Sequence, residues 1–177
     1  VDEVQANVTA AGARLLEYFD DFLARRREDA DEHDDIIAAL IRSQVDGEPL
    51  GDADLLNIMF LMFAGLDTVT ASLSCVLAWL GQHPAERDRL VADRSLIPAA
   101  VEELMRYESP VPSGARYAEA DIDLGDDVII RAGEAIHAIW SAANVDPTFY
   151  DDPLSVDFAR GRPNHIVFAS GTHRCLG

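Results

Sequence analysis

Residues 168–177 read Phe-Ala-Ser-Gly-Thr-His-Arg-Cys-Leu-Gly and place one cysteine, Cys175, in a short glycine-containing loop. Gly171 permits backbone angles and a close approach of the backbone that a side chain would forbid. His173 and Arg174 bring positive charge beside the sulfur, which favours the thiolate over the thiol. The stretch therefore predicts a loop wrapped around a ligating thiolate. The alternative interpretation is a buried structural cysteine followed by a loop glycine.

A cysteine thiolate held in this way suits the iron of a haem. As an axial ligand it pushes electron density onto the iron and favours cleavage of the O–O bond. Backbone N–H groups close to the sulfur adjust the redox potential of such a centre and protect the ligand. We therefore expect oxygen-activating haem chemistry if Cys175 is a ligand.

The loop resembles the cysteine-ligand loop of the cytochrome P-450 family, whose pattern is Phe-Gly-x-Gly-x-His-x-Cys-x-Gly. Phe168, Gly171, His173 and Cys175 match this pattern, and the resemblance implies that they surround or bind the haem. Ala169 departs from it, because the family usually has glycine there. An alanine is tolerated at this position only if the backbone does not need a positive φ.

Three further motifs stand upstream in the family's order. Residues 64–68, Ala-Gly-Leu-Asp-Thr, lie in an apolar helical run and resemble the oxygen-activation motif. Glu103 and Arg106 resemble the Glu-x-x-Arg motif, and Arg160 resembles the loop arginine that completes a triad with it. Together with the cysteine loop, these motifs cover essentially the whole chain.

The motif at 64–68 supplies the residue types that dioxygen cleavage requires. Protons must reach the distal oxygen through an acid, an alcohol and water, and Asp67 and Thr68 are such a pair. The resemblance implies that Asp67 and Thr68 are catalytic and that Ala64 and Gly65 lie against the haem. We expect Gly65 and the Thr68 hydroxyl to open the helix locally, because a hydroxyl can bond to a carbonyl one turn earlier. The alternative is a structural Asp–Thr pair at an ordinary kink.

Glu103 and Arg106 lie three residues apart and so share one helical face. In the family, the triad that they form with Arg160 is structural and supports haem incorporation. Such a buried network is costly unless it is fully hydrogen-bonded, but it can fix how distant segments dock.

The haem propionates need cationic partners. The resemblance places Arg116 and His173 in that role, with His165 as a weaker third candidate. The alternative for Arg116 is an ordinary surface arginine. For His165 a structural role is equally open.

The resemblance also implies the remaining chemistry. Haem b would be the cofactor, and one atom of dioxygen would enter an apolar small molecule. Electrons would come from NAD(P)H through a ferredoxin or flavin-type donor protein that docks near Arg174. Candidate pocket residues are Met62, Phe63, Leu66, Val69, Val111, Pro112 and Ser113, although apolar helical stripes more often pack in a core.

Composition limits the class of protein. The chain has 177 residues, 49% of them hydrophobic, which is enough for one domain with a core. A formal charge of −18 argues against nucleic acid and anionic membranes as partners. Two cysteines fit a reducing cytoplasm. A disulfide between Cys75 and Cys175 would remove the proposed ligand, so we expect both to be thiols.

No membrane anchor is expected from the hydropathy pattern. Residues 55–66 are strongly apolar, but Asp67 and Thr68 interrupt them before the ~20 residues of a full crossing.

The predicted fold is mainly α with a small β region, as in the C-terminal part of the P-450 fold. Hydrophobic periodicity, caps and breakers predict helices over 4–27, 36–45, 52–82, 84–93, 99–107 and 142–144, with short strands between 111 and 137. One partial P-450 domain would then comprise a helical part (1–108), strands and a meander (109–167) and the haem-ligand loop (168–177).

Two alternatives to a complete monooxygenase remain. A peroxide-driven family member is one, but that subclass tends to lose the acid–alcohol pair present at residues 67–68. The other is an incomplete fragment with no haem binding or activity of its own, because family members are much longer than 177 residues. Exposed apolar faces would then be expected to aggregate.

Overall fold

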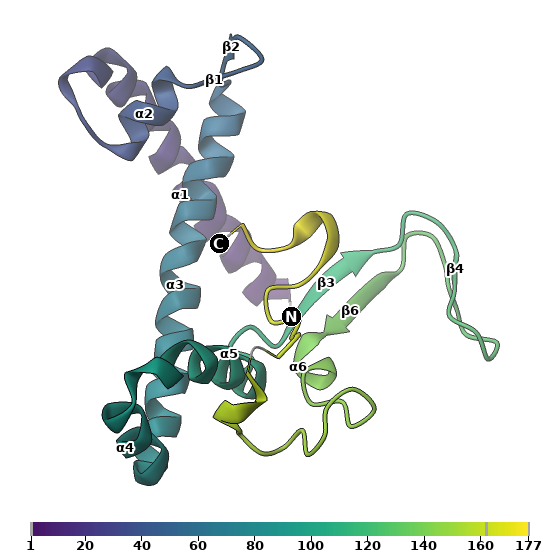
Figure 1. Ribbon diagram of the computed structural model, residues 1–177. Helices are drawn as coiled ribbons and strands as arrows, with labels where there is room; N and C mark the ends of the chain where they lie inside the picture. Colours follow the sequence, from purple (N-terminus) through teal and green to yellow (C-terminus); the bar gives the residue numbers. More distant parts are fainter. Residues whose placement is uncertain (1, 162, 177) are drawn as a thin grey trace. The chain divides into compact units, whose positions relative to one another are not determined.

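The computed structural model describes residues 2–161 and 163–176 (Figure 1). Gly177, the last residue of the predicted ligand loop, lies outside the described residues. The chain divides into two compact units, Val1–Asp67 and Thr68–Gly177, each of which is described by itself.

In chain order, with η for a 3-10 helix, the elements are α1 (Asp2–Glu28), η1 (Ala30–Glu32), α2 (Ile36–Arg42), β1 (Gln44–Val45), β2 (Glu48–Pro49), α3 (Asp52–Gln82), α4 (Pro84–Ala92), η2 (Arg94–Leu96), α5 (Ile97–Glu108), β3 (Ser113–Tyr117), β4 (Ile122–Asp123), β5 (Ile129–Ile130), β6 (Ala135–Ile139), α6 (Trp140–Ala143), η3 (Phe158–Arg160) and η4 (Gly171–His173).

The first unit buries side chains from α1, α2 and the start of α3. Leu23, Ala38 and Leu55 are almost fully excluded from solvent. Asp35 caps α2 by accepting a hydrogen bond of 3.0 Å from the Ala38 N–H, and it also pairs with Arg26 of α1. Caps and ion pairs of this kind satisfy helix ends and hold the short α2 beside α1.

Residues 44–49 form a small hairpin where the sequence predicted the end of a helix. The helix predicted over 36–45 stops at Arg42, and β1 pairs antiparallel with β2. Asp46 and Gly47 connect the strands with φ angles of 54° and 86°. Two positive φ angles in succession suit a tight hairpin turn. The predicted turn is therefore confirmed, and the predicted helix end is wrong.

Helix α3 begins and ends at the predicted residues and runs without a break through 64–68. The expected local opening at Gly65 and Thr68 is therefore not found. The reason is that α-helix continues on both sides with strong helix formers such as Leu66 and Ala64, and one glycine costs only about 1 kcal/mol.

The apolar surface of α3 is unusually exposed. Phe63, Leu66 and Val69 are 49%, 69% and 57% exposed. Within the described residues α3 is long and apolar enough to cross a membrane by length and composition alone. The sequence argument against a span is thus wrong on these criteria, because one carboxylate, Asp67, does not end the apolar run. The core helix of a soluble protein passes the same test.

The second unit has a core between the end of α3, α4, α5 and η3. Ala100, Leu104 and Phe158 are its buried centre, and Val76 and Trp79 of α3 pack against it. Burial of Phe158 on α5 fixes η3, the short helix that carries Arg160.

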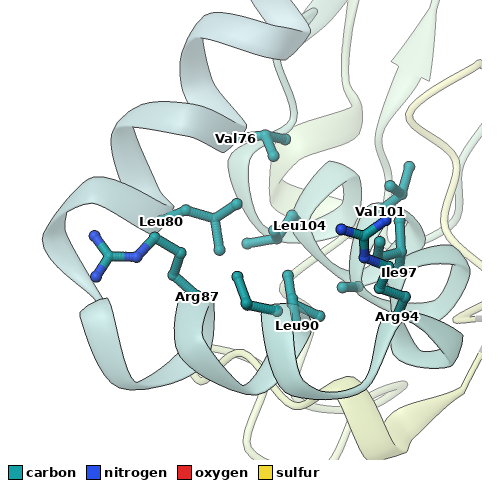
Figure 2. A pocket seen from close by; sticks show the side chains of 10 residues that line it. Val76, Leu80, Arg87, Leu90, Arg94, Ile97, Val101 and Leu104 are labelled. Atoms are coloured by element: carbon teal, nitrogen blue, oxygen red, sulfur yellow. The ribbon is translucent and has the colours of Figure 1, made fainter.

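An apolar groove of about 400 Å³ lies beside this core (Figure 2). Val76 and Leu80 of α3 line it together with Leu90 of α4 and Leu104 of α5. None of the described residues that we predicted to form a substrate pocket lines it.

The predicted strands are confirmed as two antiparallel pairs, of which Figure 1 shows β3 and β6 as arrows side by side. β3 pairs with β6 from Ser113 opposite Ile139 to Tyr117 opposite Ala135, and β4 pairs with β5. Gly114 is required in β3, because a Cβ there would lie 2.6 Å from the Trp140 ring.

The cysteine loop closes on itself through two backbone hydrogen bonds. The Ala169 N–H donates to the Ile166 carbonyl at 2.8 Å, and the Cys175 N–H donates to the Phe168 carbonyl at 2.9 Å. Gly171 has a φ of 73°, as its predicted conformational role requires.

Ala169 also has a positive φ, of 57°. The condition under which an alanine is tolerated here without strain, a backbone that needs no positive φ, is therefore not met. The left-handed conformation brings the Cβ of an L-residue close to the following carbonyl and costs roughly 1–2 kcal/mol, which glycine avoids. The loop thus has a left-handed residue where the family pattern has glycine, and it carries the strain of an added methyl group.

Replacing Ala169 by glycine is expected to stabilise the protein by ~0.5–1 kcal/mol, because the relief of strain exceeds the added freedom of the unfolded chain. Urea denaturation measures the change. The matched control is Ala159→Gly in η3, where φ is not positive and glycine should destabilise. Equal signs for the two variants would contradict the assignment of strain to Ala169.

Candidate functional site

The structure brings Glu103, Arg106 and Arg160 together in one network. Glu103 and Arg106 are both 0% exposed. Arg106 donates two hydrogen bonds of 2.8 Å to the Glu103 carboxylate, from Nε to Oε2 and from Nη2 to Oε1. Arg160 Nε and the Asp157 N–H each donate to Oε1 at 3.1 Å. The buried carboxylate is therefore fully hydrogen-bonded, the condition under which such a network is tolerable.

The remaining donors of the two arginines hold the meander after α6. Arg106 donates from Nη1 to the carbonyls of Asn144 and Pro153 at 2.8 Å and from Nη2 to that of Ser155 at 3.0 Å. Arg160 Nη1 donates to the Asp151 carbonyl at 2.8 Å. The irregular segment is thus docked on α5 by arginine-to-carbonyl bonds.

The surroundings of Glu103 favour its charged form. Burial, the largest influence, raises the pKa of Glu103, but the hydrogen bonds from Arg106, from the Asp157 N–H and from Arg160, with the charge of Arg106, together hold that pKa below its ordinary value. A carboxyl group that stays ionised in the folded protein links stability to pH.

Asn144 is a functional candidate that the sequence reasoning missed. It is 0% exposed, and its side chain joins the end of α5 to the segment that enters the cysteine loop. In the sequence it appeared only as the end of a short helix. The sole available signal was an amide at the end of an otherwise apolar stretch, which does not reveal its partners.

Cys175 lies in the loop with an exposed side chain, and both Cys75 and Cys175 are thiols. His173 and Arg174 next to it are exposed as well. The loop therefore presents a sulfur atom and two cationic residue types on one short surface segment.

Arg116 projects from β3 and is exposed. Its guanidinium lies 6.0 Å from the centre of the Trp140 ring, and Nη1 donates to the Ala115 carbonyl at 2.8 Å. The close approach of Trp140 to Gly114 thus places an aromatic ring beside Arg116 that helps to orient it. The exposed guanidinium is therefore a candidate partner for an anionic group.

His165 has a different environment. Its side chain is only 4% exposed, and Nε2 lies 3.0 Å from Oε2 of Glu102 on α5. Its Nδ1 is buried and has no hydrogen-bond partner among the residues that the structure describes. The ring is therefore directed towards α5, and this geometry favours Arg116 and His173 over His165 as partners of a haem propionate.

Two histidines with no assigned role in the sequence have structural partners. The His83 ring stacks on Trp79 with a centroid distance of 3.9 Å. His137 Nε2 lies 2.8 Å from the Ser113 hydroxyl on the neighbouring strand.

The predicted oxygen-activation residues lie at the boundary between the two units. Ala64, Gly65 and Asp67 belong to the first unit, and Thr68 belongs to the second with Cys175. Asp67 and Thr68 are exposed on α3, and the Thr68 carbonyl accepts a hydrogen bond of 2.8 Å from Ser72 Oγ. Their catalytic role stays a prediction.

A family model described as Cytochrome P450 matches residues 2–177. The chain belongs to the cytochrome P450 family. Its fold class, mainly α with a small β region, is confirmed by P450 structures that share it.

Named P450 relatives are bacterial. Cytochrome P450 107B1 of Saccharopolyspora erythraea is 34% identical over 177 residues, which cover 99% of this chain and 42% of that protein. The steroid C26-monooxygenase of Mycolicibacterium smegmatis is 33% identical over 166 residues, 93% of this chain and 41% of that protein. The chain thus spans less than half the length of these relatives.

Solved P450 structures agree with the fold. The Bacillus subtilis P450 PksS of bacillaene polyketide synthesis superposes with a TM-score of 0.84 at 34% identity, covering 91% of this chain and 42% of that one. The tirandamycin C-bound monooxygenase TamI gives 0.84 at 34% identity, with 97% and 43% covered.

Glu103→Gln is expected to lower the free energy of unfolding by about 3 kcal/mol, because it leaves buried guanidinium charge without a full partner. Urea denaturation measures this change. Haem loading should be lost rather than turnover merely slowed, and pigment content measures that. Glu102→Gln, one residue away and partly exposed, is the control and should cost less than about 1 kcal/mol. A well-loaded but slow Glu103→Gln protein would contradict the structural role.

Stability should also fall in acid. Because the folded pKa of Glu103 is depressed, its contribution is present above the unfolded pKa of about 4.3 and is lost as the pH falls through the folded pKa. We expect the free energy of unfolding to decline more steeply below about pH 4 in the wild type than in Glu103→Gln. Urea titrations across this range test the expectation, and parallel pH profiles would argue against it.

Proposed function

We propose that this chain is the haem-thiolate part of a P450 monooxygenase, which inserts one atom of dioxygen into an apolar small molecule. The observation that carries the proposal is the position of Cys175. Its side chain is exposed, and its backbone N–H closes the loop by donating a hydrogen bond to the Phe168 carbonyl. Family membership supports it, and so do the activities for which relatives are named, a steroid C26-monooxygenase and a cyclomarin C epoxidase among them.

The donor set fits haem b. The thiol sulfur of Cys175 would bind the iron, and the exposed Arg116 and His173 would hold the propionates by charge-assisted hydrogen bonds. Phe168, 42% exposed, and Gly171 would border the ring. The family resemblance adds Ala64 and Gly65 of α3 as haem-contacting residues. Bound haem would supply the redox chemistry of oxygen activation.

The chain's own residues would manage protons and substrate. Asp67 and Thr68, adjacent on α3, would hold and pass protons through a carboxylate and a hydroxyl. Phe63, Leu66 and Val69 expose apolar side chains on the same helix, which supports an apolar substrate. Relatives named for vitamin D3 and steroids are consistent with that class.

Electrons would come from NAD(P)H through a ferredoxin or flavin-type protein, which exposed Arg174 would help to dock. The setting would be the cytoplasm, and the formal charge of −18 argues against nucleic acid as a partner.

A second candidate is a fragment that binds no haem by itself. Two observations favour it: the chain covers only 42% of a relative such as Cytochrome P450 107B1, and α3 leaves large apolar side chains exposed. Apolar surface of this extent normally needs a covering partner.

The deciding experiment is the carbon-monoxide difference spectrum of the reduced protein, recorded for this chain and for the complete product of its gene. We expect the red-shifted Soret band of thiolate-ligated haem in the complete product, lost in Cys175→Ala and kept in Cys75→Ala. The band in both proteins would show that this chain binds haem unaided. Its absence from both would refute the haem-thiolate proposal.

A further inference from the structure

We propose that Asn144 is a positioning residue for the thiolate loop, which it ties to the end of α5. The inference rests on the proposed function in so far as the loop carries a haem ligand. It concerns a side chain outside the Cys loop, the triad and the oxygen-activation motif.

Asn144 lies where three segments meet. Its backbone carbonyl accepts from Arg106 Nη1 at 2.8 Å, which ties it to the triad. Its Nδ2 donates to Ser109 Oγ at 2.9 Å. Its Oδ1 accepts from the Ile166 N–H, also at 2.9 Å. The side chain therefore uses both ends of its amide, and its full burial makes each lost bond costly.

Ser109 is itself held rigidly on α5. It ends the helix with φ 41° and ψ 65°, and its N–H donates to the Met105 carbonyl. Its hydroxyl donates to the Arg106 carbonyl at 2.9 Å, and the residue is 3% exposed. Asn144 is thus hydrogen-bonded to a buried helix end, and this contact orients its amide so that Oδ1 faces the Ile166 N–H.

Ile166 connects Asn144 to the cysteine loop through two backbone hydrogen bonds. Its N–H donates to Asn144 Oδ1. Its carbonyl accepts from the Ala169 N–H at 2.8 Å, and this is the first hydrogen bond of the cysteine loop. Next in the loop, Phe168 offers the carbonyl that receives the Cys175 N–H. One side-chain bond to Ile166 therefore restrains the segment from which the cysteine loop begins. A metal ligand held by such outer contacts binds in one orientation.

The test compares variants of the complete, haem-loaded gene product. Asn144→Ala removes the acceptor for Ile166 but keeps the backbone carbonyl that Arg106 uses. Ser109→Ala removes the contact of the Asn144 amide with the end of α5 but leaves the acceptor for Ile166, so it should have a smaller effect than Asn144→Ala. Asn144→Asp keeps an acceptor at the position of Oδ1.

Amide hydrogen exchange is the first readout and needs no haem. In Asn144→Ala the Ile166 amide should exchange about tenfold faster than in the wild type, with α5 still protected. Ser109→Ala and Asn144→Asp both lose the contact between the amide and Ser109 but keep the acceptor for Ile166, so their exchange should lie between that of the wild type and that of Asn144→Ala. The second readout is the carbon-monoxide spectrum, in which Asn144→Ala should lose part of the thiolate band to that of a neutral thiol.

Equal exchange at Ile166 in Asn144→Ala and Ser109→Ala would overturn the proposal. So would exchange in Asn144→Asp as fast as in Asn144→Ala, and the Asp variant decides the matter if the Ala variant does not fold. A wild type without the thiolate band would refute the proposed function instead, while the exchange comparison would still decide whether Asn144 orders the loop.

Discussion

The second unit depends on one buried carboxylate. Glu103 receives hydrogen bonds from two arginines and a backbone N–H, and without them its charge could not remain in a solvent-excluded site. The N–H groups of the two arginines that do not bind Glu103 donate to backbone carbonyls in the segment after α6. A helix, a meander and the approach to the cysteine loop are thereby held to a common point. Hydrophobic packing supports this centre through Phe158, which docks η3 on α5.

Polar and apolar contacts have different roles in the second unit. Leu104 and Phe158 provide non-directional burial, which brings η3 and α5 together. The arginine bonds provide direction, since a planar guanidinium accepts only a narrow range of partner positions. The segment after α6 needs that direction because it has little regular structure of its own.

The sequence predicted the long helix α3 well. It predicted the end of the second helix and the backbone conformation of single loop residues less well. The ends of α3 were predicted closely because Asp52, expected as its N-cap, and continuous apolar periodicity agree, although the structure has Asp52 in the first turn of the helix. The helix over 36–45 was predicted too long, since residues 44–45 pair across a turn whose partner strand carries no strong pattern. The positive φ of Ala169 was out of reach as well, because alanine gives no sign of a left-handed conformation.

For the site, sequence motifs brought out the residues whose types are distinctive. Glu103, Arg106 and Arg160 were found in this way, and the structure joins them. The partners of His165 and Asn144 were not found, because both depend on contacts between segments distant in sequence, such as Glu102 with His165. Pairings of that kind follow from tertiary packing rather than from local pattern.

The bonds from Arg106 to carbonyl groups also bear on how the chain can vary. The acceptors at Pro153 and Ser155 are backbone atoms, which every amino acid supplies. The side chains of this stretch can therefore be substituted in evolution, and the segment stays bound to Arg106 as long as its backbone keeps the same path. Insertions or deletions there would shift the carbonyls out of register. Length, more than composition, is what natural variants of this segment should preserve.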